Sequence, residues 1–343
     1  MPHFTPSTMP TTGRVPYSSE DALRAVFKDT RCLVTGGAGF VGSRVAEKLL
    51  ELGAHVSILD DFTTGREELV PPAAVLHRGS ITDKTLVNTL VEEADHVFHL
   101  AARVLSSSTN DVLADAEVNI GGMLNILIAL RDSPRKNRRL VYSGTTSIYG
   151  NPSHLPCTED ERPNILSPYA ASKYAAESYC HVFYELFQVP FSIVRYSNVY
   201  GPHQSPRNPY CGVISKFLIA AQAGLPLGIH GSGMQTRDFT YVDDAVTATL
   251  LAAIVPRAEG QIFNVGTGVE TTILALAETV RRITGGRSEI QYIDRRDIDN
   301  VQRRVMNIEK ARQTLRWIPF THLQSGLALT HQWLIKDANT APA

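Results

Sequence analysis

The chain has 343 residues, of which 43% are hydrophobic and 20% charged, and its net charge is −1. This length allows two domains, or one large domain with an inserted lobe, around a sizeable core. So small a net charge gives no sign of a basic surface for nucleic acid or membrane, and we expect neither as a partner. The N-terminus lacks a charged start followed by a hydrophobic block, and no uninterrupted apolar run is long enough for a span. We therefore expect a cytoplasmic protein.

The cysteines give no indication of a metal site. Cys32, Cys157, Cys180 and Cys211 are scattered without the close pairing that zinc sites show, and no histidines cluster around them. We expect reduced thiols and no metal.

The first residues differ from the rest of the chain. Residues 1–16 are rich in Pro, Ser and Thr, and residues 18–27 have the pattern of a short capped helix, so residues 1–28 are predicted to be an arm with one helix. After them strand and helix patterns alternate. Strands are predicted at 31–35, 55–59, 74–77, 96–100, 138–143 and 190–196, and helices at 40–52, 83–93, 112–132 and 168–188. This alternation predicts an α/β fold, a Rossmann-type doubly wound parallel sheet.

Within that alternation, the first predicted strand ends in a glycine cluster that leads directly into a helix. Gly36 can turn with positive φ, Gly39 allows close approach to a phosphate, and Gly42 lets the helix lie close to the strand. Asp60 ends the next strand, 18 residues after Gly42, where a carboxylate can accept both hydroxyls of an adenosine ribose. These features predict a dinucleotide site. Asp60 would repel a 2′-phosphate, which favours NAD, although Arg66 nearby leaves NADP open.

A second group of residues has the chemistry of an active site. Tyr169 and Lys173 lie four residues apart on a predicted helix, so the ammonium can lower the pKa of the phenol toward that of a base. The strand at 138–143 ends in a run of hydroxyl residues, at the sheet edge where ligands bind. A surface Tyr–Lys pair and a self-capping Ser/Thr loop would explain each feature singly. Together they predict a catalytic site.

The strand–helix rhythm changes after about residue 200. Loops rich in Pro and Gly with short helices predict a smaller C-terminal α/β lobe at 201–235 and 269–336, which would bind substrate. A helix at 236–254 and a strand at 261–265 predict that 236–268 returns to the NAD-binding domain, placed at 29–200. Residues 337–343 are predicted to be a tail.

Several motifs occur in a characteristic order. They are Thr35–Gly42, Asp60, His99–Ala102, Asn119, Tyr169 with Lys173, Arg195–Pro202, Gln235–Phe239 and Asn264–Gly268. With them the chain resembles, from about residue 31 to 335, the nucleotide-sugar epimerases and dehydratases of the extended short-chain dehydrogenase/reductase family.

The resemblance implies a role for each matching position. Tyr169 is implied as the catalytic base, Lys173 as the ligand of the nicotinamide ribose, and Thr145 as the hydroxyl that bonds the reacting sugar oxygen. The implied NAD contacts are Gly36, Gly39, Phe40, Val41, Gly42, Asp60, Asp61, Ser80, Ile81, Leu100, Ala101, Ala102, Asn119, Ser143, Tyr169, Lys173 and Tyr196. The implied substrate contacts are Thr145, Thr146, Ser147, Asn198, Val213, Leu227, Ile229, Arg237 and Arg296. Asn198, Arg237 and Arg296 would bind phosphate, and residues 213–229 would wall the nucleobase pocket. A homodimer through the helices at 112–132 and 168–188 is also implied.

The residues after Thr145 distinguish the reactions of this family. Its members first oxidise a sugar hydroxyl to a ketone; dehydratases then use an Asp-Glu pair directly after the Thr, and UDP-glucuronate decarboxylases have Ser-Glu there. Thr146 and Ser147 stand at these positions, and neither titrates near pH 7. We therefore predict C4 epimerisation of a UDP-hexose through a 4-keto intermediate. UDP-glucuronate decarboxylation and NDP-sugar dehydration are the alternatives, and a non-catalytic NAD-binding protein is disfavoured by the intact Tyr169, Lys173 and Thr145.

Overall fold

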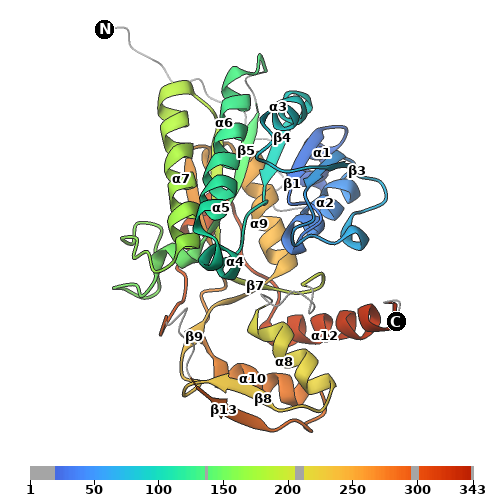
Figure 1. The fold of residues 1–343 in the computed structure, drawn as a ribbon, viewed down its shortest axis with the longest axis vertical. Helices are drawn as coiled ribbons and strands as arrows, with labels where there is room; N and C mark the ends of the chain where they lie inside the picture. The colour runs from blue at the N-terminus through green and yellow to red at the C-terminus, as the bar shows by residue number, and fades with distance from the viewer. Residues whose placement is uncertain (1–19, 136–137, 205–211, 295–300, 341–343) are drawn as a thin grey trace, which may run out of the picture.

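The computed structural model describes residues 20–135, 138–204, 212–294 and 301–340. The predicted arm at 1–16, Cys211 and Arg296 lie outside these ranges. Figure 1 shows a large lobe built on one sheet and, below it, a smaller lobe that contains α8, α10 and α12.

The central sheet has seven strands, all parallel. In spatial order they are β11 (Gln261–Val265), β6 (Phe191–Tyr196), β5 (Arg139–Thr145), β4 (His96–His99), β1 (Arg31–Thr35), β2 (His55–Asp60) and β3 (Val75–Arg78). The strand order reverses between β1 and β4, and a ligand crevice is expected at the carboxyl ends of strands at such a point. The six predicted strands of this region are confirmed to within a few residues, and so is the strand at 261–265.

Helices cover both faces of the sheet (Figure 1). One layer contains α3 (Lys84–Glu93), α6 (Gly122–Asp132) and α7 (Pro168–Phe187), and the other contains α1 (Glu20–Phe27), α2 (Phe40–Glu51) and α9 (Val242–Ile254). Consecutive strand residues face opposite layers: Leu33 packs in the core with α3 and α6, whereas Val34 packs in the core with α2 and α9. Near-continuous apolar strands are what a sheet buried on both faces requires. The predicted doubly wound fold is confirmed.

The helical stretch Val112–Asp132 is long and apolar enough to cross a membrane by length and composition alone. It consists of α5 (Val112–Ala116), a π-helical turn (Glu117–Gly121) and α6. Met123, Ile126 and Leu127 of α6 are fully buried in the core between the sheet and α7. This part of the stretch therefore packs as a core helix.

The smaller lobe is built from short elements. They are α8 (Val213–Gln222), β8 (Leu227–His230), α10 (Ile273–Ile283) and β13 (Ile290–Ile293), together with the longer helix α12 (Leu323–Thr340). Helix α11 (Glu309–Thr314) contacts β11 of the central sheet instead. Two small pairings, β7 (Asn198–Tyr200) with β10 (Phe239–Tyr241) and β9 (Thr236–Arg237) with β12 (Thr271–Thr272), lie between the lobes. The helix predicted at 236–254 is wrong at its start: residues 236–241 form β9 and β10, and α9 begins only at Val242. Pairing with distant strands overrides the local helical pattern there.

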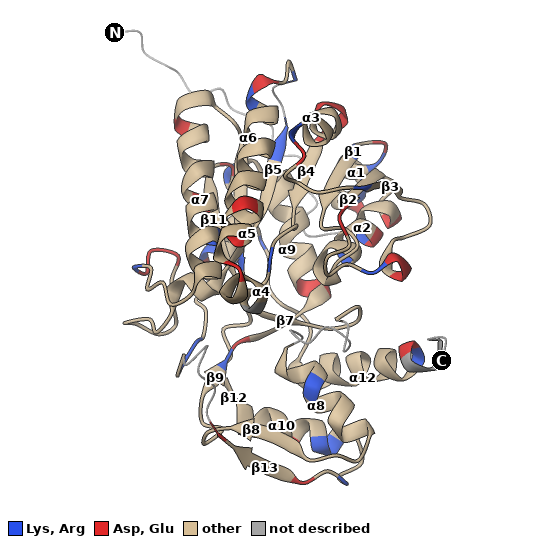
Figure 2. Cartoon of the chain, in the orientation of Figure 1, with Lys and Arg blue, Asp and Glu red and all other residues tan. Residues whose placement is uncertain are grey.

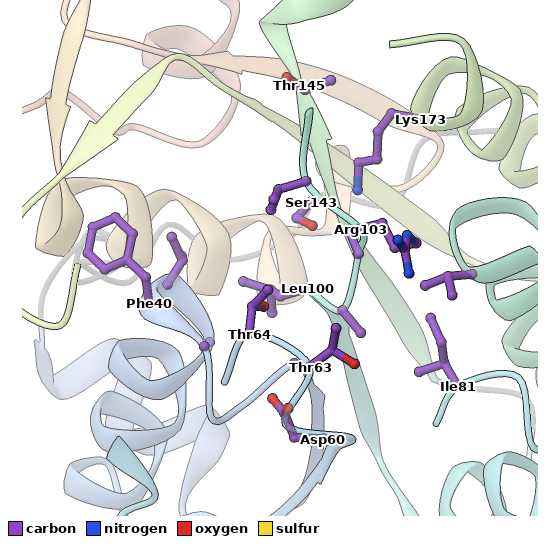
Figure 3. A pocket seen from close by; sticks show the side chains of 18 of the residues that line it. Phe40, Asp60, Thr63, Thr64, Ile81, Leu100, Arg103, Ser143, Thr145 and Lys173 are labelled. Atoms are coloured by element: carbon purple, nitrogen blue, oxygen red, sulfur yellow. The ribbon is translucent and has the colours of Figure 1, made fainter. Parts of the chain in front are cut away.

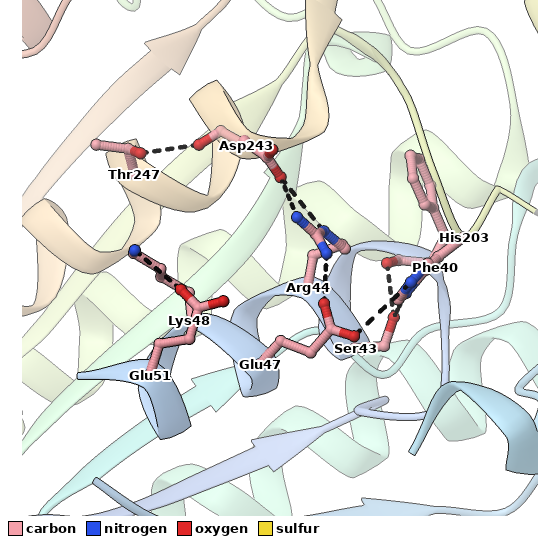
Figure 4. A network of polar contacts seen from close by, with 9 residues as sticks. All are labelled: Phe40, Ser43, Arg44, Glu47, Lys48, Glu51, His203, Asp243 and Thr247. Carbon is pink, nitrogen blue, oxygen red and sulfur yellow. Dashed lines mark hydrogen bonds and ion pairs between the residues drawn. The ribbon is translucent and has the colours of Figure 1, made fainter. Parts of the chain in front are cut away.

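Polar contacts join helix α2, which follows the glycine cluster, to helix α9 and to the loop after β7 (Figure 4). Arg44 donates to Asp243 of α9 at 2.8 Å. The Ser43 hydroxyl donates to the Phe40 carbonyl at 3.1 Å, which leaves its oxygen to accept from Nδ1 of His203 at 2.8 Å. His203 belongs to the loop after β7, so the loop that leads into the smaller lobe contacts the first turn of α2.

Candidate active site

A cavity of about 360 Å³ lies at the carboxyl edge of the sheet (Figure 3). It brings together most of the predicted NAD-binding and catalytic residues. Those that line it are Gly36, Gly39, Phe40, Val41, Gly42, Asp60, Asp61, Ile81, Leu100, Ala101, Ala102, Ser143, Thr145, Tyr169, Lys173 and Tyr196. They come from elements far apart in the chain, and only the parallel sheet unites them.

The glycine cluster forms a cradle with no space for side chains. Gly36 has φ +71°, and a Cβ there would lie 2.6 Å from the amide nitrogen of Ala101. A Cβ at Gly42 would lie 2.0 Å from the carbonyl oxygen of Gly36. Gly39 is the N-cap of α2 and has no side-chain cap, so the helix N-terminus faces the cavity with free N–H groups. This is the arrangement that a dinucleotide diphosphate fits.

Asp60 lies at the end of β2 and is only 8% exposed. Its two carboxylate oxygens each accept one backbone N–H, from Ala38 and from Phe62, both at 2.9 Å. Burial raises the pKa of Asp60, and these two hydrogen bonds oppose the rise. Each oxygen keeps a further lone pair for a ribose hydroxyl. The carboxylate therefore braces the glycine loop and fits the adenosine ribose as predicted.

The catalytic pair stands at the start of α7. Ser167 caps this helix by accepting the amide of Ala170 at 3.2 Å, and Pro168 is its first residue. Tyr169 then lines the cavity, as does Thr145 from the end of β5. Side-chain hydrogen bonding with Thr145 lowers the pKa of Tyr169, but burial outweighs it and raises that pKa to about 12.

Lys173 is 2% exposed, and its Nζ lies 4.1 Å from the centre of the Tyr142 ring. Burial lowers the pKa of Lys173 from 10.5 to about 7. The expectation that this lysine brings the Tyr169 pKa down is therefore not met in the protein alone. Burial penalises both charged forms, the phenolate and the ammonium, and so raises the pKa of Tyr169 while it lowers that of Lys173.

The comparison with known proteins rests on most of the chain. A model described as the NAD dependent epimerase/dehydratase family matches residues 32–266. The chain belongs to this family. NAD is accordingly its cofactor, and the residues of the cavity fit it.

Two curated relatives and one solved structure illustrate the range of the family. A putative UDP-glucose 4-epimerase of Methanocaldococcus jannaschii is 36% identical over 310 residues, which cover 90% of this chain and 99% of the relative. A UDP-N-acetyl-alpha-D-glucosaminuronate decarboxylase of Bacillus cytotoxicus is 35% identical over 324 residues, with coverage of 90% and 99%. The crystal structure of the UDP-glucose 4-epimerase of Thermotoga maritima with UDP-glucose is similar with a TM-score of 0.86 and 34% identity, covering 90% of this chain and 99% of that one. The chain is thus similar to epimerases and to a decarboxylase.

In this member of the family, two predicted NAD contacts do not line the cavity. The Ser80 hydroxyl accepts from the amide and the hydroxyl of Thr82 at 3.2 and 3.0 Å, in the turn before α3. Asn119 is 2% exposed, in the π-helical turn between α5 and α6. It bonds the main chain of Arg103 and the hydroxyl of Ser172, so it acts behind the cavity wall.

The predicted substrate residues are more widely spread. Thr146 and Ser147 begin a 3₁₀ turn beside the cavity lining, and Asn198 has a buried side-chain oxygen for which the described part of the chain offers no hydrogen-bond partner. Arg237 is 7% exposed and donates to the carbonyls of Thr236 and Val301 at 2.8 and 2.9 Å. It therefore joins β9 to the segment after the undescribed residues 295–300, which contain the predicted phosphate ligand Arg296.

That Leu227 and Ile229 wall a nucleobase pocket stays a prediction. Both are fully buried in the apolar core, because β8 alternates and turns them inward. Val213 is only partly buried, at the first position of α8.

The most informative lining residue that the sequence did not reveal is Arg103. It follows β4 and lines the cavity between Lys173 and Ile81 (Figure 3). Its Nε is buried with no hydrogen-bond partner among the described residues. An arginine directly after the His99–Ala102 motif, at a strand end, was the available signal. Thr63, Thr64 and Val118 also line the cavity and carry no comparable sequence signal.

Proposed function

We propose that this chain epimerises a nucleotide sugar at C4 through a transient 4-keto sugar, with a UDP-hexose of the glucose or galactose type as substrate. The observation that supports this best is the Thr145–Tyr169 pair in the cavity, followed in the chain by the hydroxyl residues Thr146 and Ser147. Epimerisation requires a base at the reacting oxygen and no second acid or base to expel water. The UDP-glucose bound to the Thermotoga maritima epimerase supports the choice of nucleotide.

In this scheme Tyr169 takes the proton of the sugar hydroxyl and later returns it, while Thr145 holds the same oxygen by a hydrogen bond. Lys173, as an ammonium, stabilises the phenolate and orients the nicotinamide ribose. NAD supplies, when bound, the hydride acceptor and donor for the sugar carbon. Asn198 and Arg237 contact the substrate diphosphate, and residues 201–235 and 269–336 act as the nucleotide-sugar lobe.

Decarboxylation of a UDP-hexuronate is the second candidate. The Bacillus cytotoxicus relative is a decarboxylase at 35% identity. A 4-keto sugar with a carboxylate β to the ketone loses carbon dioxide with little assistance, so the lack of Glu at Ser147 does not exclude the reaction.

One experiment separates the candidates. The purified protein is incubated with UDP-glucose, UDP-N-acetylglucosamine and UDP-glucuronate, and the products are analysed by chromatography and mass spectrometry. An isobaric product with inverted C4 supports epimerisation, loss of carbon dioxide assigns decarboxylation, and loss of water assigns dehydration. Tyr169→Phe is expected to abolish turnover but retain NAD, while Tyr174→Phe, one turn away at the α7 surface, is expected to remain active. Full activity of Tyr169→Phe would remove Tyr169 as the base.

The assembly we propose is a homodimer through α7. Only Lys173, Glu177 and Glu185 are charged along its length, and Figure 2 shows the helix mostly tan. It leaves apolar side chains at the surface, which are Tyr174, Tyr179, Val182, Leu186 and Phe187. In the other helix expected at the interface, Ile126, Leu127 and Leu130 of α6 are buried in the core, and Leu124 is partly buried against it. Light scattering should give twice the chain mass, and Val182→Glu should give monomer. A cytoplasmic location stays a prediction.

A further inference from the structure

A buried carboxylate lies one helical turn beyond the catalytic lysine. Glu177 of α7 is 1% exposed, four residues after Lys173 and thus on the same helix face. Arg195 of β6 donates to both of its oxygens, from Nη2 to Oε2 at 2.7 Å and from Nε at 3.1 and 3.3 Å. Such a fork-to-fork pair fixes the carboxylate in position and keeps it ionised.

The arginine is itself held on its far side. Its Nη1 donates to the Tyr149 hydroxyl at 2.7 Å and to the Glu159 carbonyl at 3.0 Å. The Tyr149 hydroxyl then donates to Oδ1 of Asn264, on β11, at 2.7 Å. The ion pair therefore belongs to a satisfied network that reaches from α7 through β6 to the edge strand of the sheet.

Strand β5, which carries Thr145, has a glycine where it meets the Glu177–Arg195 pair. A Cβ at Gly144 would lie 2.6 Å from Oε1 of Glu177 and 3.1 Å from Cγ of Arg195. Gly144 directly precedes Thr145, whose side chain lines the cavity. The Glu177 carboxylate thus lies against the end of β5, next to the residue Thr145.

Lys173 needs a counter-charge in this environment. Its ammonium is buried and lies over the face of the Tyr142 ring, a weak substitute for water. An ammonium without a paired anion tends to lose its proton when buried. The groups that interact electrostatically with Lys173 are His99 from β4, Asp115 from α5, and Glu177 and Cys180 from α7. Those that interact with Glu177 or Arg195 are Tyr142 from β5, Cys180 and His181 from α7, and Tyr149, Cys157 and Glu159 from the segment after β5.

We propose that Glu177 is a positioning residue for Lys173: its carboxylate, fixed by Arg195 in the space left by Gly144, keeps the buried ammonium charged and in place. The proposal rests on the role proposed for Lys173, but it concerns a property of that side chain which can be measured without any sugar substrate.

The pKa directions agree with this arrangement. Burial lowers the pKa of Lys173, and Glu177 is the largest influence that opposes the fall. Burial also raises the pKa of Glu177, and Arg195 is the largest influence that lowers it. Arg195 therefore favours the charged form of Glu177, and Glu177 favours the charged form of Lys173.

The test is a direct titration of Lys173 in the NAD-bound protein. Lysine labelled with ¹³C at Cε reports the charge of each amine by NMR, and the signal missing from Lys173→Met identifies this residue. Glu177→Gln removes the charge and keeps the shape, so the Lys173 midpoint should fall by about one pH unit. Glu185→Gln, at an exposed position on the same helix, is the matched control and should leave the midpoint unchanged. An unchanged midpoint in Glu177→Gln overturns the proposal.

A second variant covers the case in which Glu177→Gln does not fold. Gly144→Ala keeps every charge but places a methyl group against the carboxylate, so the Lys173 midpoint should fall in the same direction. A folded Gly144→Ala protein with the wild-type midpoint also overturns the proposal. Because the titration needs no turnover, a chain that lacks epimerase activity but shows the shift would contradict the proposed function and leave the role of Glu177 standing.

Discussion

The side-chain amide of Asn119 forms hydrogen bonds with both the main-chain N–H and the main-chain carbonyl of Arg103. Its Oδ1 accepts the Arg103 N–H at 2.9 Å, and its Nδ2 donates to the Arg103 carbonyl at 3.3 Å. The same Nδ2 lies 2.8 Å from Oδ1 of Asp115 and 3.0 Å from Oγ of Ser172. Asn119 thereby joins the loop after β4 to α7, which carries the catalytic tyrosine and lysine. The family resemblance implied a direct NAD contact for Asn119. In the structure, Asn119 instead supports the main chain of the cavity wall.

Removing the Asn119 side chain should loosen the cavity wall without removing any group that lines the cavity. We expect Asn119→Ala to lower the free energy of unfolding by about 1–3 kcal/mol, because buried donors and acceptors lose their partners. NAD should also bind more weakly, which isothermal titration calorimetry measures. Asn88→Ala is the control, since Asn88 is exposed on α3 and its side chain bonds that of Glu92 at 3.3 Å. Wild-type NAD affinity in a folded Asn119→Ala protein would show that the hydrogen bonds of Asn119 to Arg103 do not shape the site.

The guanidinium of Arg103 should bind an anionic group of the cofactor. Arg103 lines the cavity, and no hydrogen bond or ion pair joins its guanidinium to the described residues. One charge-assisted hydrogen bond is worth about 1.5 kcal/mol, so Arg103→Met should weaken NAD binding about tenfold. Adenosine has no phosphate and should bind to both proteins equally. The control is Arg131→Met, an exposed residue of α6 paired with its neighbour Asp132. Equal losses for NAD and adenosine would contradict a phosphate contact.

How much the sequence could predict depended on whether a signal was local. The glycine cradle, Asp60 and the start of α7 follow from spacing and capping, and the structure has them where they were expected. The inward orientation of Leu227 and Ile229 depends on which face of β8 meets α8 and α10, which spacing does not reveal. The pKa values of Tyr169 and Lys173 depend on burial, a property of the folded chain. The Glu177–Arg195 pair brings together residues 18 apart on two elements and had no local signal.

The glycine cradle offers a matched pair of alanine substitutions. Gly42→Ala would place a methyl group 2.0 Å from the Gly36 carbonyl oxygen, so α2 must move away from the turn. We expect a lower melting temperature and at least about a tenfold loss of NAD affinity, since a small misplacement of the helix N-terminus weakens its hold on phosphate. At Gly121, in the π-helical turn, a Cβ would have no atom within 4 Å among the described residues apart from its chain neighbours and the backbone of its own helix. Gly121→Ala should be neutral or stabilise by about 0.5–1 kcal/mol. Equal behaviour of the two variants would show that the cradle tolerates a side chain.

Acid should destabilise the fold through histidines that are buried without charge, and His96 provides the cleanest test. Its ring packs against those of Phe27 and Phe98, at centroid distances of 5.4 and 6.5 Å, and its Nδ1 is buried with no hydrogen-bond partner among the residues that the structure describes. Burial lowers the pKa of His96 from 6.5 to about 4. The unfolded chain therefore binds the proton more tightly, so the contribution of His96 to stability is complete above pH 6.5 and is lost as the pH falls toward 4.

His96→Phe should remove this part of the acid sensitivity, about 2 kcal/mol near pH 5. Thermal unfolding at about pH 7.5 and about pH 5 should thus show a smaller drop in melting temperature for His96→Phe than for the wild type. His154→Gln serves as the control, because the His154 side chain is 87% exposed. His99 and His203, whose pKa values burial lowers to about 3 and about 4, keep the remaining sensitivity in every variant. If His96→Phe loses as much stability in acid as the wild type, His96 is already protonated in the folded protein and the packing of its ring against Phe27 does not exclude the charge.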